Sequence, residues 1–172
     1  IDTEFGAYYL NYHGRTPYVS AFRSTTGPFS AGFDGTYTVA YPEDIELFGL
    51  SYQTSVGTWA LSGEVSYRPD FPIQINGNDL LVAFLTDGLD PRSPMSSRVP
   101  ATAPGSLIDG FDEYDVYQIQ TTAIQFFDRV LGASRLSLAA EIGATFVDGL
   151  PDAESASGGL PSNPRYGRAT AF

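Results

Sequence analysis

The sequence has 172 residues and a formal net charge of −11, which is enough chain for one domain. Only 17% of the residues are charged and 14% are aromatic, while Gly and Pro contribute 18 and 12 residues. This composition excludes a coiled coil, a helical bundle and a charged disordered tail. The acidic balance argues against nucleic acid as a partner, and the absence of cysteine excludes disulfides and thiolate chemistry.

Short β-strands joined by turn-rich loops suit this composition best. Five segments alternate between apolar and polar residues with the period of two that indicates a strand. The five segments are residues 4–13, 44–56, 58–68, 115–127 and 134–149. In the first of them, no apolar face can be chosen from the residues alone.

The third and fifth segments have the clearest faces. In the third, Trp59, Leu61, Gly63, Val65 and Tyr67 alternate with small and polar residues. The fifth repeats this pattern, with its apolar positions taken by Leu136, Leu138, Ala140, Ile142, Ala144 and Phe146.

The connections between these strands alternate in length. Short turns near Gly57 and Gly132 join the second strand to the third and the fourth to the fifth. Residues 14–43 and 69–114 form long loops, and residues 78–85 within the second predict one short helix, with Asn78 or Asp79 as its N-cap. Short turns at one end and long loops at the other are typical of outer-membrane barrels.

Two all-β architectures fit the alternation: a soluble β-sandwich and a membrane β-barrel. The apolar face of residues 58–68 carries an aromatic residue at each end, Trp59 and Tyr67. Eight residues span about 26 Å in a strand, or roughly 20 Å along the normal of a membrane when tilted, close to the apolar band of roughly 25 Å in such barrels. The pattern favours the barrel, with Trp59, Tyr67 and Phe146 as interface aromatics.

Residues 41–76 and 136–151 resemble a proteobacterial outer-membrane family catalogued as domain of unknown function thirteen-oh-two, and residues 4–20 resemble it in the same order. The resemblance implies an antiparallel, up-and-down β-barrel in the outer membrane of a Gram-negative bacterium, with loops facing the exterior. It also implies passive transport of apolar or amphipathic molecules. Lipid and lipopolysaccharide would be the partners.

Five strands cannot close a membrane barrel, for which about eight are needed. We therefore expect residues 1–172 to be a single domain that forms an internal segment of a larger barrel. The alternative is a structural or interaction subunit whose open sheet edges pair with other copies of the chain. A weaker alternative is a soluble sandwich that binds carbohydrate through Tyr18, Phe29 and Tyr37.

The polar faces of the third, fourth and fifth strands would line a water-filled interior. Glu64 and Glu141 are expected at similar height, about 10 Å apart, as a constriction that selects permeants. Pairing of these carboxylates with Arg68 or Arg135, as a brace of the wall, is the favoured interpretation. The candidate lining residues are Glu64, Arg68, Gln118, Gln120, Arg135 and Glu141.

The remaining candidate sites give weaker signals. Residues 108–115 cluster four carboxylates that are a weak candidate for Ca²⁺, although an acidic solvated loop is favoured and no other cofactor is expected. The lone His13 has no catalytic partners in sequence, and no enzyme motif is present. Loop arginines are expected to pair with acidic loop residues rather than with lipopolysaccharide phosphates. The carboxylates are Asp109, Asp112, Glu113 and Asp115, and the arginines are Arg15, Arg23, Arg92 and Arg98.

Overall fold

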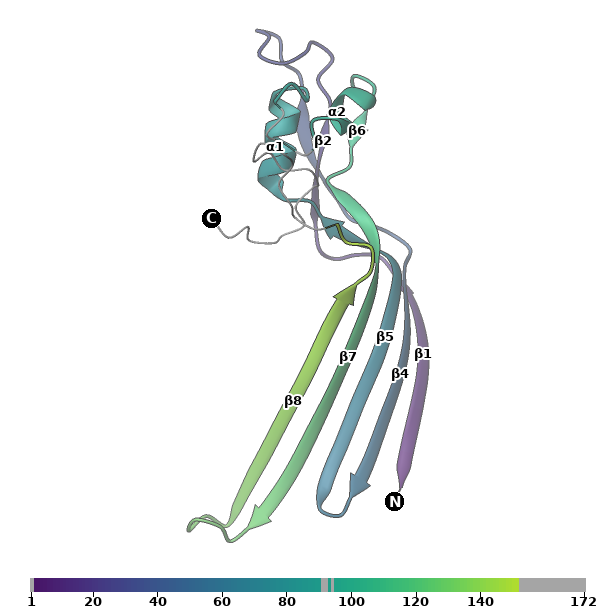
Figure 1. Cartoon of the computed structure of the whole chain (residues 1–172), viewed down its shortest axis with the longest axis vertical. Coiled ribbons are helices and arrows are strands. Elements are labelled where there is room, and N and C mark those ends of the chain that lie inside the picture. Colours follow the sequence, from purple (N-terminus) through teal and green to yellow (C-terminus); the bar gives the residue numbers. More distant parts are fainter. Residues whose placement is uncertain (1, 91–92, 94, 152–172) are drawn as a thin grey trace. The chain divides into compact units, whose positions relative to one another are not determined.

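The computed structural model describes residues 2–90, 93 and 95–151. Arg92 therefore lies outside the described residues. The fold is mostly antiparallel β-sheet, as the alternation predicts, with two helices in the described part of the chain (Figure 1). The chain divides into two compact units, which we call the sheet unit (residues 1–12, 44–71 and 114–148) and the loop unit (residues 13–43, 72–113 and 149–172).

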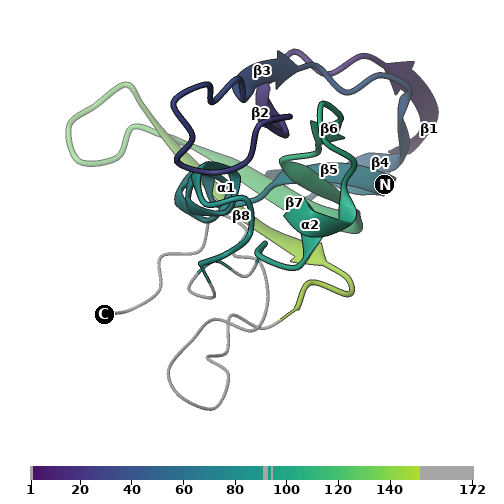
Figure 2. The ribbon, with the colours of Figure 1, turned by 90° about the horizontal axis from the view of Figure 1, so that it is seen from above.

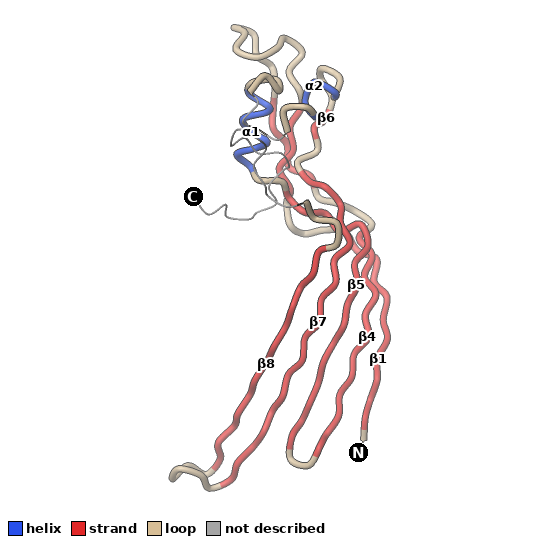
Figure 3. The backbone as a smooth tube through the Cα atoms, viewed as in Figure 1, coloured by secondary structure: helices blue, strands red, loops and turns tan. Residues whose placement is uncertain are grey.

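The sheet unit is built on five long strands in the order β1-β4-β5-β7-β8, each antiparallel to its neighbour where the register is resolved (Figures 1 and 3). All five were predicted from the alternation. A two-residue turn at Gly57 and Thr58 joins β4 to β5, and the φ of 61° at Gly57 explains the glycine. The strands are β1 (Thr3–Tyr12), β4 (Ile45–Val56), β5 (Trp59–Gln74), β7 (Phe111–Asp128) and β8 (Arg135–Val147).

The loop unit has more regular structure than the sequence predicts. It contains a small three-stranded sheet in the order β3-β2-β6, where long loops are expected, and a second helix. Figure 2 shows α1 almost end-on. The elements are β2 (Tyr18–Phe22), β3 (Thr36–Ala40), α1 (Gly77–Leu85), α2 (Arg98–Ala101) and β6 (Leu107–Ile108).

The helix predicted over residues 78–85 is α1, but the predicted N-cap, Asn78 or Asp79, lies two or three positions after the observed one. The cap is Asn76, whose side-chain oxygen accepts a hydrogen bond from the backbone N–H of Asn78. The inner face of α1 packs into the core of the loop unit. The buried cluster comprises Ile75, Leu80, Ala83, Met95, Val99 and Ile108.

Gln74 and Gly110 join separate segments of the loop unit through hydrogen bonds. The Gln74 side chain accepts from the N–H of Val19 and donates to the carbonyl oxygen of Gly110, at 2.7 and 2.5 Å. Gly110 also accepts from the N–H of Ile75 and donates to the Ser20 hydroxyl. A Cβ at residue 110 would lie 1.7 Å from the Val19 carbonyl oxygen, so only glycine permits this close approach.

Tyr18 contributes to the same interior. It is buried, donates its hydroxyl to the carbonyl oxygen of Pro72 and packs edge-on against Phe111. It therefore cannot act as a surface residue for carbohydrate, and that part of the sandwich alternative is wrong. Phe29 and Tyr37 are exposed.

Candidate functional site: a sheet with one apolar and one polar face

The strand register assigns every residue of the five-stranded sheet to one of two faces. Residues directly opposite each other in an antiparallel pair project from the same side. Phe48 lies opposite both Tyr9 of β1 and Tyr67 of β5, and Tyr117 lies opposite Phe146 of β8. The rings of Tyr67 of β5 and Tyr117 of β7 stack with their centroids 4.8 Å apart. These two side chains therefore project from the same side of the sheet, and all the residues named above share one face.

This face, the apolar face, is continuous across all five strands. The pairing also identifies the apolar face of β1, because Phe5, Ala7 and Tyr9 lie opposite apolar residues of β4. Its apolar members include Phe5, Ala7, Tyr9, Phe48, Leu50, Tyr52, Val56, Trp59, Leu61, Val65, Tyr67, Tyr117, Ile119, Phe127, Leu136, Leu138, Ile142 and Phe146.

Most of the apolar face is exposed. Phe5 is 82% and Ile142 is 72% accessible, and Trp59 and Leu138 are also exposed. In the described residues of the sheet unit no second layer packs on the face, so Trp59, Leu61, Leu138 and Ile142 do not form the dry core of a sandwich. A soluble monomer rarely exposes more than a few hundred Å² of contiguous apolar surface.

An aromatic row crosses the apolar face at one level. Tyr9 and Phe48 have ring centroids 5.0 Å apart, Phe48 and Tyr67 are 6.3 Å apart, and the row continues through Tyr117 to Phe146. The sequence analysis identified Tyr67 and Phe146 but not the row, because it depends on pairing between strands. Trp59, which lies opposite Val56, is the first residue of β5, and Tyr67 lies eight residues further on in the middle of the strand.

Polar groups near the centre of the apolar face form hydrogen bonds within the protein. Tyr52 donates its hydroxyl to Thr121 Oγ1 at 2.6 Å, and Thr121 donates to the carbonyl oxygen of Ser62. The Tyr52 ring lies across Gly63, where a Cβ would come within 2.5 Å of it. One tyrosine thus links β4, β5 and β7 and leaves its hydroxyl satisfied in an apolar setting.

The opposite face, the polar face, carries all six predicted lining residues. Within it, a hollow of about 370 Å³ opens over β1, β4, β5 and β7. The face is apolar at the end near Leu10 and Leu47 and polar through its centre. Its polar members include Glu4, Ser51, Gln53, Ser62, Glu64, Arg68, Gln118, Gln120, Thr122, Arg135 and Glu141.

The predicted pairing of Glu64 and Glu141 with arginines is wrong. Arg135 bonds Asp128, directly opposite it across the hairpin, at 3.0 Å. Glu141 accepts from the Thr122 hydroxyl at 3.3 Å. Arg68 places its guanidinium over the ring of Phe71, 5.4 Å from its centroid.

Tyr8 is a polar-face residue that the sequence analysis did not single out. It lies opposite Gly49 of β4, and its ring covers that glycine, with the hydroxyl oxygen 2.3 Å from where a Cβ on residue 49 would be. Glu64 lines the hollow, and no ion pair joins it to an arginine in the described part of the chain. Parity along each strand identified Glu64, whereas the place of the Tyr8 ring requires the pairing of β1 with β4.

The four carboxylates proposed for Ca²⁺ do not come together. Asp112, Glu113 and Asp115 belong to β7, not to a loop. Asp112 pairs with Arg98 at 2.8 Å, while Asp115 accepts from the Tyr67 hydroxyl and the Asp70 N–H. Neither these residues with Asp109 nor any other three His, Cys, Asp or Glu in the described chain form a metal-ligating group.

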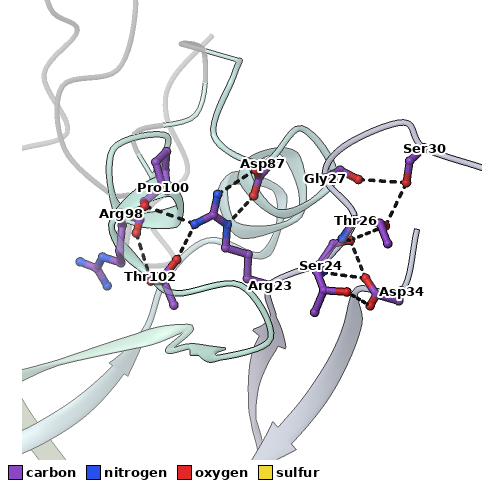
Figure 4. A network of polar contacts seen from close by, with 11 residues as sticks. Arg23, Ser24, Thr26, Gly27, Ser30, Asp34, Asp87, Arg98, Pro100 and Thr102 are labelled. Carbon is purple, nitrogen blue, oxygen red and sulfur yellow. Dashed lines mark hydrogen bonds and ion pairs between the residues drawn. The ribbon is translucent and has the colours of Figure 1, made fainter. Parts of the chain in front are cut away.

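Arg23 and Arg98 pair with acidic residues, as predicted. Arg23 makes a bidentate bond to Asp87, with Nε 2.6 Å and Nη2 2.9 Å from its oxygens (Figure 4). Its Nη1 donates to the carbonyl oxygens of Pro100 and Thr102 at the end of α2. One guanidinium thereby joins β2, α1 and α2 in the loop unit.

Acid should weaken this Arg23 junction. Hydrogen bonds from Arg23 lower the pKa of Asp87 below its ordinary value. The pair therefore stabilises the loop unit above about pH 4, the unfolded pKa of Asp, and the contribution is lost as pH falls through the lower native pKa. We expect Asp87→Asn to cost about 1–3 kcal/mol at neutral pH and to reduce the acid sensitivity of the loop unit.

Limited pepsin digestion between pH 5 and pH 2 measures this effect, comparing wild type and variant at each pH. Asp128→Asn is the control, since the Arg135–Asp128 pair is about two-thirds exposed and such pairs contribute about 0–1 kcal/mol. Equal acid sensitivity of Asp87→Asn and wild type would contradict the assignment.

Comparison with known proteins identifies a family for this chain. Residues 1–172 match the model of a family described as "Protein of unknown function (DUF1302)". The chain belongs to the DUF1302 family. This confirms the family that the sequence resembles. No curated protein and no solved structure matches the DUF1302 chain.

The described residues of this DUF1302 chain contain two helices, α1 and α2. Neither α1 nor α2 has the length and apolar character needed to cross a bilayer.

Proposed function

We propose that the five-stranded sheet is a segment of an outer-membrane β-barrel wall whose interior permits passive transport. The single observation that carries the proposal is the continuous, exposed apolar face, crossed by an aromatic row and backed by a polar face. Hydrocarbon is the environment in which such a face lowers the free energy of the protein, while the polar face faces water. Aromatic rings at one level match the boundary between hydrocarbon and head groups.

The sheet needs strand partners at both edges. β1 and β8 each have one neighbour among the described strands, which leaves the outer backbone groups of both without strand pairing in that set. Unpaired N–H and C=O groups cost several kcal/mol each in lipid. Further strands of the same barrel would satisfy them.

The same open edges support one alternative: a structural or interaction subunit that closes its sheet with other copies of the chain. The number of chains per closed sheet distinguishes the two proposals. A single chain supports the transport segment, and several identical chains support the assembly subunit.

Apolar or amphipathic molecules are the proposed cargo, in an outer membrane with the loop unit exposed to the exterior. The hollow on the polar face offers both charge and hydrogen-bonding groups, from Glu4, Gln53, Glu64, Gln120 and Thr122. Such a lining accommodates the head group of an amphipathic molecule. Lipid and lipopolysaccharide are the proposed surroundings, with exposed Arg15 as a candidate for phosphate contact.

Single-cysteine labelling tests the orientation of the wall, because the sequence contains no cysteine. In the full-length protein in lipid vesicles, Ile119→Cys carrying a fluorophore should be quenched by lipid-attached quenchers. The neighbouring Gln120→Cys, on the opposite face, should instead react with a water-soluble maleimide. The reverse pattern, or water access at both positions, would overturn the proposal.

A further inference from the structure

Arg68 lies where the polar face of the sheet becomes apolar. The residue before it, Tyr67, belongs to the aromatic row on the opposite face. One position further towards the same end of the sheet, the neighbouring strands β4 and β7 carry Leu47 and Val116 on the polar face. Both side chains are buried, at 8% and 5% exposure. The cation of Arg68 is therefore flanked by apolar side chains, where charge interactions are stronger than in open water.

Phe71 supports the guanidinium of Arg68 in this setting. The Cζ atom of Arg68 lies 5.4 Å from the centroid of the Phe71 ring, within the range of a cation–π contact. Asp70, between the two, has a φ of 46°, and its N–H donates to the carboxylate of Asp115. This left-handed position interrupts the alternation of β5, so that Phe71 comes to lie beside Arg68. An aromatic ring, and not an acid, thus orients the cation.

The guanidinium of Arg68 has no protein acceptor in the part of the chain that the structure describes. It forms no ion pair there, and its Nε atom is buried without a hydrogen-bond partner. Glu64, four positions away on the same face, is about 13 Å distant along the strand. Because arginine keeps its charge, donors removed from water without an acceptor cost free energy. An acceptor supplied by a ligand would recover it.

From this geometry we infer that Arg68 binds the carboxylate of an amphipathic molecule. The inference rests on the proposed function, since the ligand has to reach the polar face from the interior. The planar guanidinium matches the two oxygens of a carboxylate, and one guanidinium balances one negative charge. The apolar chain of the ligand would lie along the apolar end of the face, where Leu10 is half exposed. This assigns an anionic head group to the proposed cargo.

Equilibrium binding of dodecanoate to the full-length protein in lipid nanodiscs tests this site, with binding to empty nanodiscs subtracted. Wild type should bind dodecanoate saturably and more tightly than dodecanol, which has the same chain without the charge. Arg68→Gln should weaken dodecanoate binding by about tenfold or more and leave dodecanol binding unchanged. Arg68→Lys should have an intermediate affinity, because an ammonium keeps the charge but not the paired donors.

Arg135→Gln is the matched control. Arg135 lies on the same face but is paired with Asp128, so its replacement should leave dodecanoate affinity unchanged. Phe71→Leu should weaken dodecanoate binding by less than Arg68→Gln, because the charge stays and only its aromatic support is lost. Unchanged fluorescence of Trp59 identifies the folded variants. Where Arg68→Gln does not fold, the comparison of Arg68→Lys with Arg135→Gln decides.

The outcomes separate this site from the proposed function. With Ile119→Cys and Gln120→Cys labelled as expected, equal dodecanoate affinity of wild type and Arg68→Gln overturns only the site. The reverse labelling pattern overturns the proposed wall and the site with it. Equal losses in Arg68→Gln and Arg135→Gln, or tighter binding of dodecanol than of dodecanoate to wild type, also overturn the role of Arg68.

Discussion

Replacing Ile142 with arginine should destabilise the sheet in a membrane. Ile142 lies opposite Thr121, midway along the apolar face between the aromatic row and the level of Trp59. An arginine at the middle of a bilayer costs about 2–4 kcal/mol on the lipid face of a barrel. We therefore expect Ile142→Arg to lower the free energy of unfolding of the full-length protein in vesicles by that amount.

Glu141→Arg is the control on the adjacent residue. Glu141 belongs to the polar face and loses only the 3.3 Å bond from Thr122, so its cost should be well below that of Ile142→Arg. Denaturant unfolding followed by the fluorescence of Trp59, the single tryptophan of the sequence, measures both. Equal costs at the two positions would show that the faces do not meet different solvents.

Gly110→Ala should have the largest effect in the loop unit. The added methyl group would meet the carbonyl oxygen of Val19 at 1.7 Å and the side chain of Leu80 at 3.0 Å. Because the first of these is backbone, β2 or β7 has to move, which disturbs the bonds of Gly110 with Ser20 and Ile75. We expect a loss of about 3 kcal/mol or more.

Gly77→Ala provides the comparison in the same unit. Residue 77 is the first of α1, and a Cβ there has no neighbour within 4 Å. Alanine favours a helix by up to about 1 kcal/mol over glycine, so this variant should be neutral or more stable. Hydrogen exchange of the α1 amides, followed by mass spectrometry, measures both variants, and equal protection would contradict the packing at Gly110.

The long strands were predictable because their two faces differ in polarity. In β5 and β8 one parity is apolar throughout, and period two then specifies both the strand and its orientation. In β1 the tyrosines at positions 8 and 9 fall on opposite faces, so the apolar face of this strand could not be identified from the residues alone. The pairing with β4 identifies it, since Tyr9 lies opposite Phe48 and Tyr8 lies opposite Gly49.

The small sheet of the loop unit was not predictable in the same way. Its strands have five, five and two residues, too few for a period to be evident. They are stabilised by contacts from distant segments, such as those of Gln74 with Val19 and Gly110. Tertiary contacts decide the structure of such segments, and local propensity does not.

The sequence predicts the face of the sheet on which each candidate site residue lies, but not the residues that it contacts. Parity placed Glu64 and Glu141 on the same side of the sheet, where the structure has them. Their partners depend on register, which five strands fix together. The bond of Arg135 to Asp128 could have been found by counting outward from the Gly132 turn, whereas the place of the Tyr8 ring over Gly49 of β4 could not.

The aromatic row also bears on how accurately the strands find each other during folding. A slip of one residue between two strands would turn every side chain of one of them to the wrong side. A slip of two would preserve the sides but separate Phe48 from Tyr67, or Tyr67 from Tyr117, and so lose ring stacking of about 0.5–1.5 kcal/mol per pair. The five rings thus disfavour the shifts by two residues that alternation alone would tolerate. They favour the native register each time a further strand pairs with the sheet.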